Sequence, residues 1–114
     1  MRTRRIEKIN ALIKREISKF ILRNFEFPEG SFVTVTNVKT SNDLKEAKVL
    51  ISIFPKENTK KIFPQLKKNR QLIQNYLSKT LVIKQIPKIK MLIDTNQEDQ
   101  IEKIEKLIDK LKKL

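Results

Sequence analysis

The spacing of the apolar residues is the feature that most restricts what this chain can fold into, because it changes several times along the sequence. From about Thr3 to Asn24, apolar side chains recur every three or four residues, which predicts a helix with one buried face and with Thr3 as its N-cap. Residues 32–39 are rich in Val and Thr, and residues 47–54 alternate in polarity, so both predict strands. The polar turn Ser41-Asn42-Asp43 between them predicts an antiparallel hairpin.

Helical spacing returns from about Thr59 to Lys79, but the apolar stripe of this segment is interrupted. Leu66 and Leu72 are separated by the wholly polar residues 67–71, and two positions six apart on a straight helix lie about 240° out of register. The gap therefore predicts a bend within the polar segment. Pro64 fits a helix only within its first turn, so we expect the regular helix to begin just before this proline.

A third strand is expected from Val82 to Ile93, with an edge or a bulge at Pro87 because proline cannot donate to a ladder. The amphipathic pattern of residues 97–114 predicts a final helix. The expected order is α-β-β-α-β-α in a single domain spanning residues 1–114. Amphipathic helices beside three strands predict an α+β fold in which the helices cover one face of a small sheet.

Positive charge is concentrated in one part of the chain. The 114 residues carry a formal net charge of +13, and the 36 residues from Asn58 to Ile93 contain nine basic side chains and no acidic one. A field of this strength raises the energy of the compact state, so a polyanion is the expected partner. The alternative is a solvated surface, which does not account for so long a stretch without a carboxylate.

The composition argues against several kinds of chemistry. The chain has no Cys and no His, which removes disulfides, zinc–thiolate sites and the commonest catalytic base. Its one glycine, Gly30, cannot form a glycine-rich phosphate loop. Asp94, Glu98 and Asp99 cluster at an expected helix start, where the helix dipole favours acids. We therefore expect no enzymatic activity, no cofactor and no metal site.

The hydropathy of the sequence favours the cytoplasm. No apolar run approaches the roughly 18 residues of a membrane span. The basic N-terminus is not followed by a secretory apolar core, because Glu7 and Lys8 interrupt it.

Three groups of side chains are candidates for binding RNA. The segment 67–71 places cations that reach phosphates beside amides at the expected bend. The basic N-terminus is either an arm laid on phosphates or a solvated terminus. The lysines of the third strand either extend the patch or protect an edge strand from aggregation. The predicted RNA-binding residues are Arg2, Arg4, Arg5, Lys8, Lys67, Lys68, Asn69, Arg70, Gln71, Lys88 and Lys90.

The aromatic residues mostly fall within apolar stripes, so each is expected in the core. They are Phe20, Phe25, Phe27, Phe32, Phe54, Phe63 and Tyr76. This pattern predicts contacts with the backbone and the shape of folded nucleic acid rather than stacking on single strands.

Four segments of the chain carry a recognisable pattern. They are Arg4-Arg5-Ile6-Glu7-Lys8-Ile9-Asn10-x-Leu12-Ile13-Lys14-Arg15-Glu16-Ile17-Ser18, Phe32-Val33-Thr34-Val35-Thr36-Asn37-Val38, Ser41-x-Asp43-Leu44-x-x-Ala47-Lys48-Val49, and Ile86-Pro87-x-Ile89 closing on Asp94. Together they resemble the ribosome-binding factor A family, from Met1 to about Leu111.

The resemblance implies an α+β domain similar to a type II KH domain, with an α-β-β-α-β core and a C-terminal helix, and we expect it to be a monomer. It implies a partner, the small ribosomal subunit with its ribosomal RNA, whose maturation and processing such factors assist in bacteria, notably in the cold. The family is not enzymatic. Where the family has a kinked helix marked Ala-x-Gly, this chain has Asn69-Arg70-Gln71, and Ser78 matches a later family Gly.

Two other functions remain open at this point. A protein that compacts nucleic acid through charge alone, without specificity for ribosomes, is the leading alternative. A basic amphipathic helix lying on an anionic membrane is a weaker one.

Overall fold

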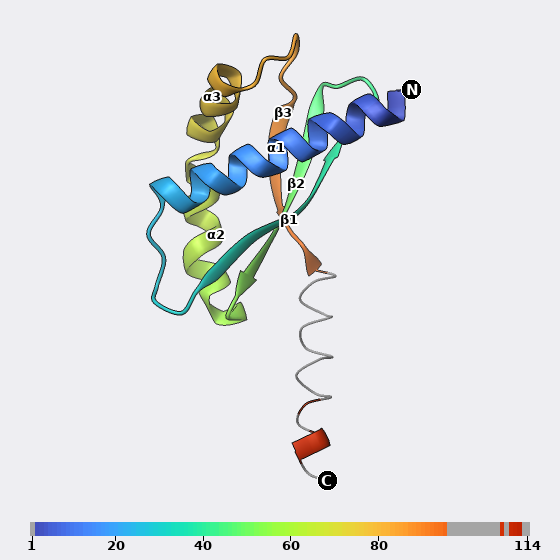
Figure 1. Cartoon of the computed structure of the whole chain (residues 1–114). Helices are drawn as coiled ribbons and strands as arrows, with labels where there is room; N and C mark the ends of the chain where they lie inside the picture. The colour runs from blue at the N-terminus through green and yellow to red at the C-terminus, as the bar shows by residue number, and fades with distance from the viewer. Residues whose placement is uncertain (1, 96–107, 109, 113–114) are drawn as a thin grey trace.

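The computed structural model of the protein describes residues 2–95, 108 and 110–112. Figure 1 shows the order of the elements along the chain. They are α1 (Arg2–Asn24), β1 (Phe32–Thr40), β2 (Glu46–Phe54), the 3-10 turn η1 (Lys56–Asn58), α2 (Thr59–Lys68), α3 (Arg70–Thr80) and β3 (Lys88–Ile93). Among the described residues, no helix is both long enough and apolar enough to cross a bilayer.

The three strands form one sheet in the order β1-β2-β3. β1 and β2 are antiparallel, which confirms the predicted hairpin, and β3 runs parallel to β2. A parallel neighbour requires a crossover connection, and α2 and α3 supply it. The pairing of β1 shifts between Val35 and Asn37, so Thr36 forms a bulge.

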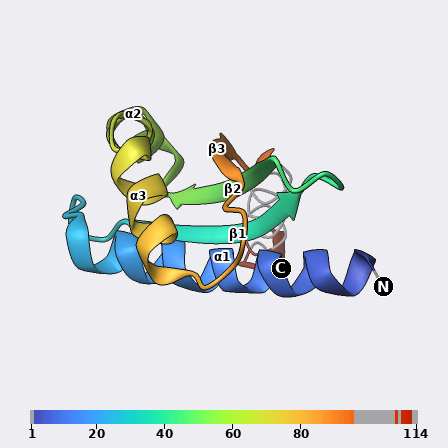
Figure 2. The ribbon, with the colours of Figure 1, turned by 90° about the horizontal axis from the view of Figure 1, so that it is seen from above.

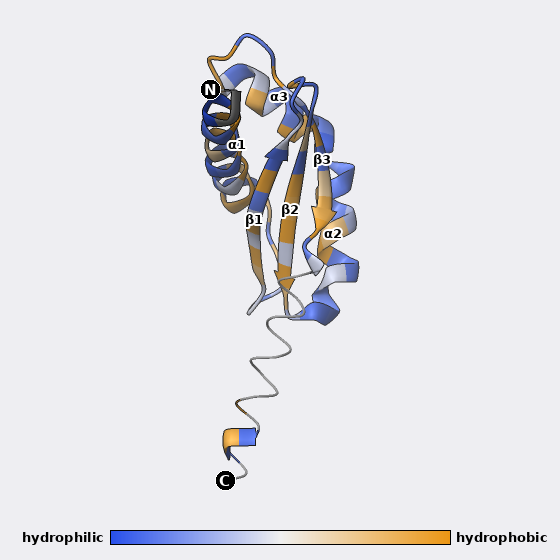
Figure 3. Cartoon of the chain, turned by 90° about the vertical axis from the view of Figure 1, so that its right-hand side faces the viewer, coloured by the Kyte–Doolittle hydropathy of each residue, from blue (hydrophilic) through white to orange (hydrophobic). Residues whose placement is uncertain are grey.

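Of the described elements, the helices α1, α2 and α3 pack against one face of the sheet and do not cover the other, which we call the open face. On β2 the odd-numbered side chains from Ala47 to Ile53 are buried, whereas Lys48 and Phe54 on the other side are exposed. Figure 3 shows the three strands side by side, with α1 to the left of β1 and α2 to the right of β3. This arrangement confirms the predicted α+β layer fold.

The core lies between the sheet and the helices, and Figure 2 shows α1 running along the β1 side, with α3 extending from α2 down to α1. Burying one aliphatic side chain of this kind stabilises the fold by about 1.5–3 kcal/mol. The buried apolar residues are Ile9, Ile13, Ile17, Ile21, Val35, Val38, Ala47, Val49, Ile51, Ile53, Ile62, Leu66, Ile73, Leu77, Leu81, Ile89 and Met91.

One buried polar contact ties α1 to α3. The Tyr76 hydroxyl donates to a carboxylate oxygen of Glu16 at 2.8 Å, and Glu16 is buried although it lies on a surface helix. This hydrogen bond lowers the pKa of Glu16 below its ordinary value of 4.5, and the nearby cations of Lys19 and Arg15 lower it further. Glu16 is therefore held as a carboxylate in the folded protein.

Three boundary predictions are wrong. Thr3 is not an N-cap, because α1 already begins at Arg2. Pro64 lies in the second turn of α2, since that helix begins at Thr59. The third strand begins at Lys88 rather than Val82, whose side chain is fully exposed. The segment before it is irregular because Val82 has no neighbouring strand to pair with.

The last helix of the sequence prediction, residues 97–114, lies mostly outside the described residues. Residues 108 and 110–112 are described, and they are helical.

Candidate nucleic-acid interface

The polar segment 67–71 contains the junction between two helices. α2 ends at Lys68 and α3 begins at Arg70, and Asn69 between them has φ −100° and ψ 17°. The Asn69 side-chain amide donates to the Gln65 carbonyl oxygen at 2.8 Å, so it satisfies a carbonyl near the end of α2. The predicted interruption of the helix is confirmed.

The reason given for the interruption, however, is wrong. Leu72 is 56% exposed and does not belong to the buried stripe. The buried Leu66 and Ile73 are seven residues apart, which on a straight helix leaves them only about 20° out of register. The two helices instead pack against different neighbours, since α2 contacts β2 whereas α3 contacts α1 and β3.

A groove of about 520 Å³ lies between this junction and the edge of the sheet. Four predicted RNA-binding cations line it: Lys67 and Arg70 come from the two helices, and Lys88 and Lys90 come from β3. A volume of this size holds ligands as large as a nucleotide. The residues that line the groove are Glu46, Lys67, Arg70, Lys88, Ile89, Lys90, Met91 and Leu92.

Side chains from α3 hold the free edge of β3 against the helices. Gln74 donates to the Pro87 carbonyl oxygen at 2.9 Å and accepts from the Ile89 amide at 2.8 Å. Arg70 donates to the Ile89 carbonyl oxygen at 3.4 Å. Gln74 thus bonds β3 much as a neighbouring strand would. Sequence reasoning missed Gln74, although its spacing of four from Arg70 places both side chains on one helix face.

The charges of the groove are mostly unneutralised. Among the described residues, the ion pairs that the structure contains join Glu16 to its helical neighbours and involve none of the groove cations. Glu46 is the one carboxylate among the described residues of the lining. The Lys67 ammonium lies 5.4 Å from the centroid of the Phe63 ring, a cation–π contact that orients this side chain. The groove therefore presents a field that attracts an anion.

The remaining members of segment 67–71 do not line the groove. Lys68 is exposed on α2. Asn69 uses its side chain within the junction. Gln71 is exposed and donates to the Asn75 side chain at 3.0 Å. The predicted five-residue cluster thus contributes two of its members to the groove.

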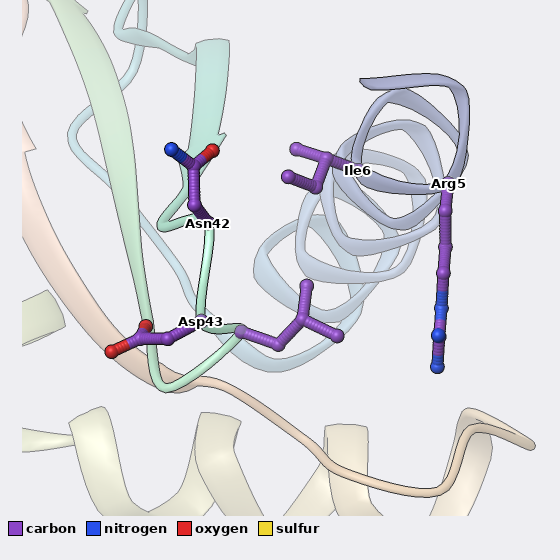
Figure 4. A pocket seen from close by; sticks show the side chains of 5 residues that line it. Arg5, Ile6, Asn42 and Asp43 are labelled. Atoms are coloured by element: carbon purple, nitrogen blue, oxygen red, sulfur yellow. The ribbon is translucent and has the colours of Figure 1, made fainter. Parts of the chain in front are cut away.

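The basic N-terminal residues lie in a different place. Arg4, Arg5 and Lys8 are exposed on α1. Arg5 lines a separate pocket between α1 and the β1–β2 turn, where its side chain points away from Asp43 (Figure 4). Of the residues that the structure describes, none lines both this pocket and the groove. The pKa of Asp43 is lowered by its hydrogen bond from Ser41, so that carboxylate belongs to the turn.

Comparison with known sequences decides which family the chain belongs to. The family model described as ribosome-binding factor A matches residues 5–108. The chain belongs to the ribosome-binding factor A family. Ribosome-binding factor A of Akkermansia muciniphila is 33% identical over 107 residues, which are 94% of this chain and 85% of that protein. The Dictyoglomus thermophilum factor is 37% identical over 112 residues, or 96% and 90% of the two chains.

Solved structures of ribosome-binding factor A share the fold. The crystal structure of the factor from Thermus thermophilus superimposes with a TM-score of 0.65 at 20% identity, covering 77% of this chain and 93% of that one. A homology model of the Thermus thermophilus factor, fitted into an electron cryo-microscopy map of its 30S complex, gives a TM-score of 0.61 at 20% identity. It covers 73% and 88% of the two chains. The expected KH-like α+β fold is confirmed.

Proposed function

We propose that this protein binds the small ribosomal subunit during its assembly, with the groove between the α2–α3 junction and β3 lying against folded ribosomal RNA. The protein acts as a single KH-like RNA-binding domain, as a monomer in the bacterial cytoplasm. It assists subunit maturation and ribosomal RNA processing by binding, including in the cold, and it catalyses no reaction.

The observation that carries this proposal is the convergence of four cations on one groove. Lys67 and Lys90 are 23 positions apart in the sequence, yet the crossover from β2 to β3 places them around one cavity. Such a surface suits phosphates, which supply most of the affinity of proteins for nucleic acid. Membership of the ribosome-binding factor A family supports the subunit as the source of that RNA.

Binding to purified small subunits tests the proposal. Labelled protein is mixed with small subunits, with bulk DNA of equal phosphate content, and with anionic vesicles, and each complex is separated by sedimentation. We expect saturable binding to the subunit, with little binding to the two competitors at physiological salt. Equal binding to DNA would instead support a charge-driven compacting protein, and preference for vesicles would support a membrane-surface helix.

The groove itself is tested by a charge-matched pair of variants. Lys67→Glu with Arg70→Glu reverses two groove cations, whereas Lys68→Glu with Lys79→Glu reverses two exposed cations of the same helices that do not line the groove. We expect the first pair to reduce subunit binding far more than the second. Thermal unfolding monitored by circular dichroism checks that both variants remain folded.

A further inference from the structure

The open face of the sheet carries a row of three lysines, two of which lie outside the groove. Lys39 of β1 pairs with Lys48 of β2, and Lys48 pairs with Lys90 of β3. All three side chains are exposed. They therefore form a straight row across the sheet, on the face that α1, α2 and α3 do not cover. Of these three lysines, only Lys90 also lines the groove.

Such a row raises the free energy of the folded protein. Side chains of directly paired residues have Cβ atoms about 4.5–5.5 Å apart, and like charges at that spacing repel. Within the part of the chain that the structure describes, none of the three lysines forms an ion pair. Two carboxylates lie on the same face outside the row, since Glu46 pairs with Lys88 and Asp94 accepts a hydrogen bond from Thr36. A bound polyanion removes the repulsion within the row, because its phosphates lie beside the three lysines.

The other end of the same face carries two exposed aromatic rings. Phe32 and Phe54 pair across β1 and β2, with ring centroids 6.4 Å apart. Phe32 is 66% exposed and Phe54 is 38% exposed, so the prediction that these rings lie in the core is wrong. They point away from the helices because their positions fall on the open side of each strand. Exposed rings on an open sheet are the feature that sheet-based RNA-binding domains use to stack bases.

The space between the two ends suits a short single strand. Phe54 follows Lys48 by six positions, or about 20 Å along a strand. At the aromatic end, Thr34 and Lys14 are exposed and line a hollow together with both rings. Ser52 and Thr36 line it too, but Ser52 is buried and the Thr36 hydroxyl donates to Asp94. The Thr34 hydroxyl can hydrogen-bond a sugar or a base edge, the rings can stack on bases, and the lysines can neutralise phosphates.

We propose that the open face of the sheet is a second RNA site, which binds a single-stranded segment of a few nucleotides. Bases stack on Phe32 and Phe54, and the phosphates that follow lie on Lys39, Lys48 and Lys90. Paired bases cannot stack on these rings, so a duplex does not use the site. A protein partner would bury the rings equally well, but it would leave the lysine row uncompensated unless it were acidic.

Titration of the ¹⁵N-labelled full chain with hexauridylate tests the proposal. We expect the amide signals of Phe32, Thr34, Ser52 and Phe54 to shift, and a fully paired RNA hairpin of equal phosphate content to leave them in place. Shifts confined to the residues of the groove would overturn the proposal. So would equal shifts of the open face with the hairpin.

Two variants test the two ends of the site separately. Phe32→Leu with Phe54→Leu keeps apolar side chains but removes the rings, and we expect it to weaken hexauridylate binding about tenfold or more. Lys39→Gln with Lys48→Gln should weaken it and reduce its salt dependence, while the charge-matched Lys60→Gln with Lys61→Gln on α2 should not. Unchanged hexauridylate affinity in the ring variant overturns the proposal, even if that variant has lost a protein contact.

The outcome is separable from that of the proposed function. The ring variant leaves the groove intact, and Lys67→Gln with Arg70→Gln leaves the rings intact. If the ring variant loses hexauridylate binding and the groove variant keeps it, the second site is supported, whatever the groove binds. Loss of subunit binding in the groove variant bears only on the proposed function.

Discussion

Removing the four groove cations should flatten the salt dependence of subunit binding. The perturbation is Lys67→Gln, Arg70→Gln, Lys88→Gln and Lys90→Gln in one protein, since these side chains line the groove together. If each neutralises one phosphate, each contributes about −0.7 to −0.9 to the slope of log affinity against log salt concentration. The magnitude of the slope should therefore be smaller in the variant than in the wild-type protein by about 3 to 3.5.

The size of the expected effect can be worked out for a practical salt range. Between about 50 and 200 mM salt, a slope contribution of this size corresponds to a loss of roughly 50- to 150-fold in affinity. The wild-type protein should suffer this loss in addition to whatever loss the variant shows. Filter binding or fluorescence anisotropy with labelled protein and small subunits, repeated at four salt concentrations, measures both slopes.

A control of equal charge makes the result interpretable. Lys60→Gln, Lys61→Gln, Lys68→Gln and Lys79→Gln removes the same number of cations from exposed positions of α2 and α3 outside the groove. Its slope should stay close to that of the wild-type protein. If both quadruple variants flatten the slope equally, the groove has no special role, and diffuse charge binding becomes the better account.

Three further predictions concern the framework of the site. Gln74→Leu should destabilise the fold by about 1–3 kcal/mol in urea unfolding, because it leaves backbone groups of the β3 edge unpaired. The control Gln71→Leu should change the stability little, and equal effects of the two variants would contradict the role of Gln74 at the edge. Tyr76→Phe should reduce stability at pH 7. The Glu16 pKa is lowered in the folded state, so this stability is present above its ordinary value of 4.5 and is lost as pH falls through the folded value. The difference from wild type should therefore shrink on acidification, and a pH-independent difference would refute the linkage. Leu66→Ala should lower the free energy of unfolding by about 2–5 kcal/mol, and Leu72→Ala should lower it by less than about 0.5 kcal/mol. A larger loss for Leu72→Ala than for Leu66→Ala would contradict the assignment of Leu66 to the buried stripe.

The order of the elements was predictable from the sequence because periodicity is a local property. The spacing of Ile9, Ile13 and Ile17 specifies a helix with one buried face, whatever the rest of the chain does. Strand β3 was harder, because its start depends on its partners. Lys88 donates its amide to Lys45, and Gln74 bonds the neighbouring edge, neither of which a local pattern reveals.

The sequence indicated which residues could form the candidate site, but it did not indicate which of them lie together. The absence of acids from residues 58–93 drew attention to a set of cations, four of which the structure places around one groove. Which of them meet depends on the crossover: Lys67 and Arg70 reach the groove, and Lys68 beside them does not. Lys39 and Lys48 were missed because they lie outside the acid-free stretch, and only the strand pairing places them beside Lys90.

The exposed phenylalanines show a further limit of pattern reading. Alternation indicates that Lys48 and Phe54 share a face of β2, but it does not indicate which face the helices cover. An apolar ring in a strand was therefore assigned to the core. The tertiary structure reverses that assignment for Phe32 and Phe54 alike.

Site-directed cross-linking to assembling small subunits tests the central claim most directly. The chain has no cysteine, so a single introduced cysteine carries the photo-cross-linker at a chosen position. Lys67→Cys places it in the groove, and Lys79→Cys places it on the same crossover but outside the lining. The account predicts cross-links to ribosomal RNA from position 67 and few from position 79. Cross-links from position 79 alone, or only to ribosomal proteins from position 67, would contradict it.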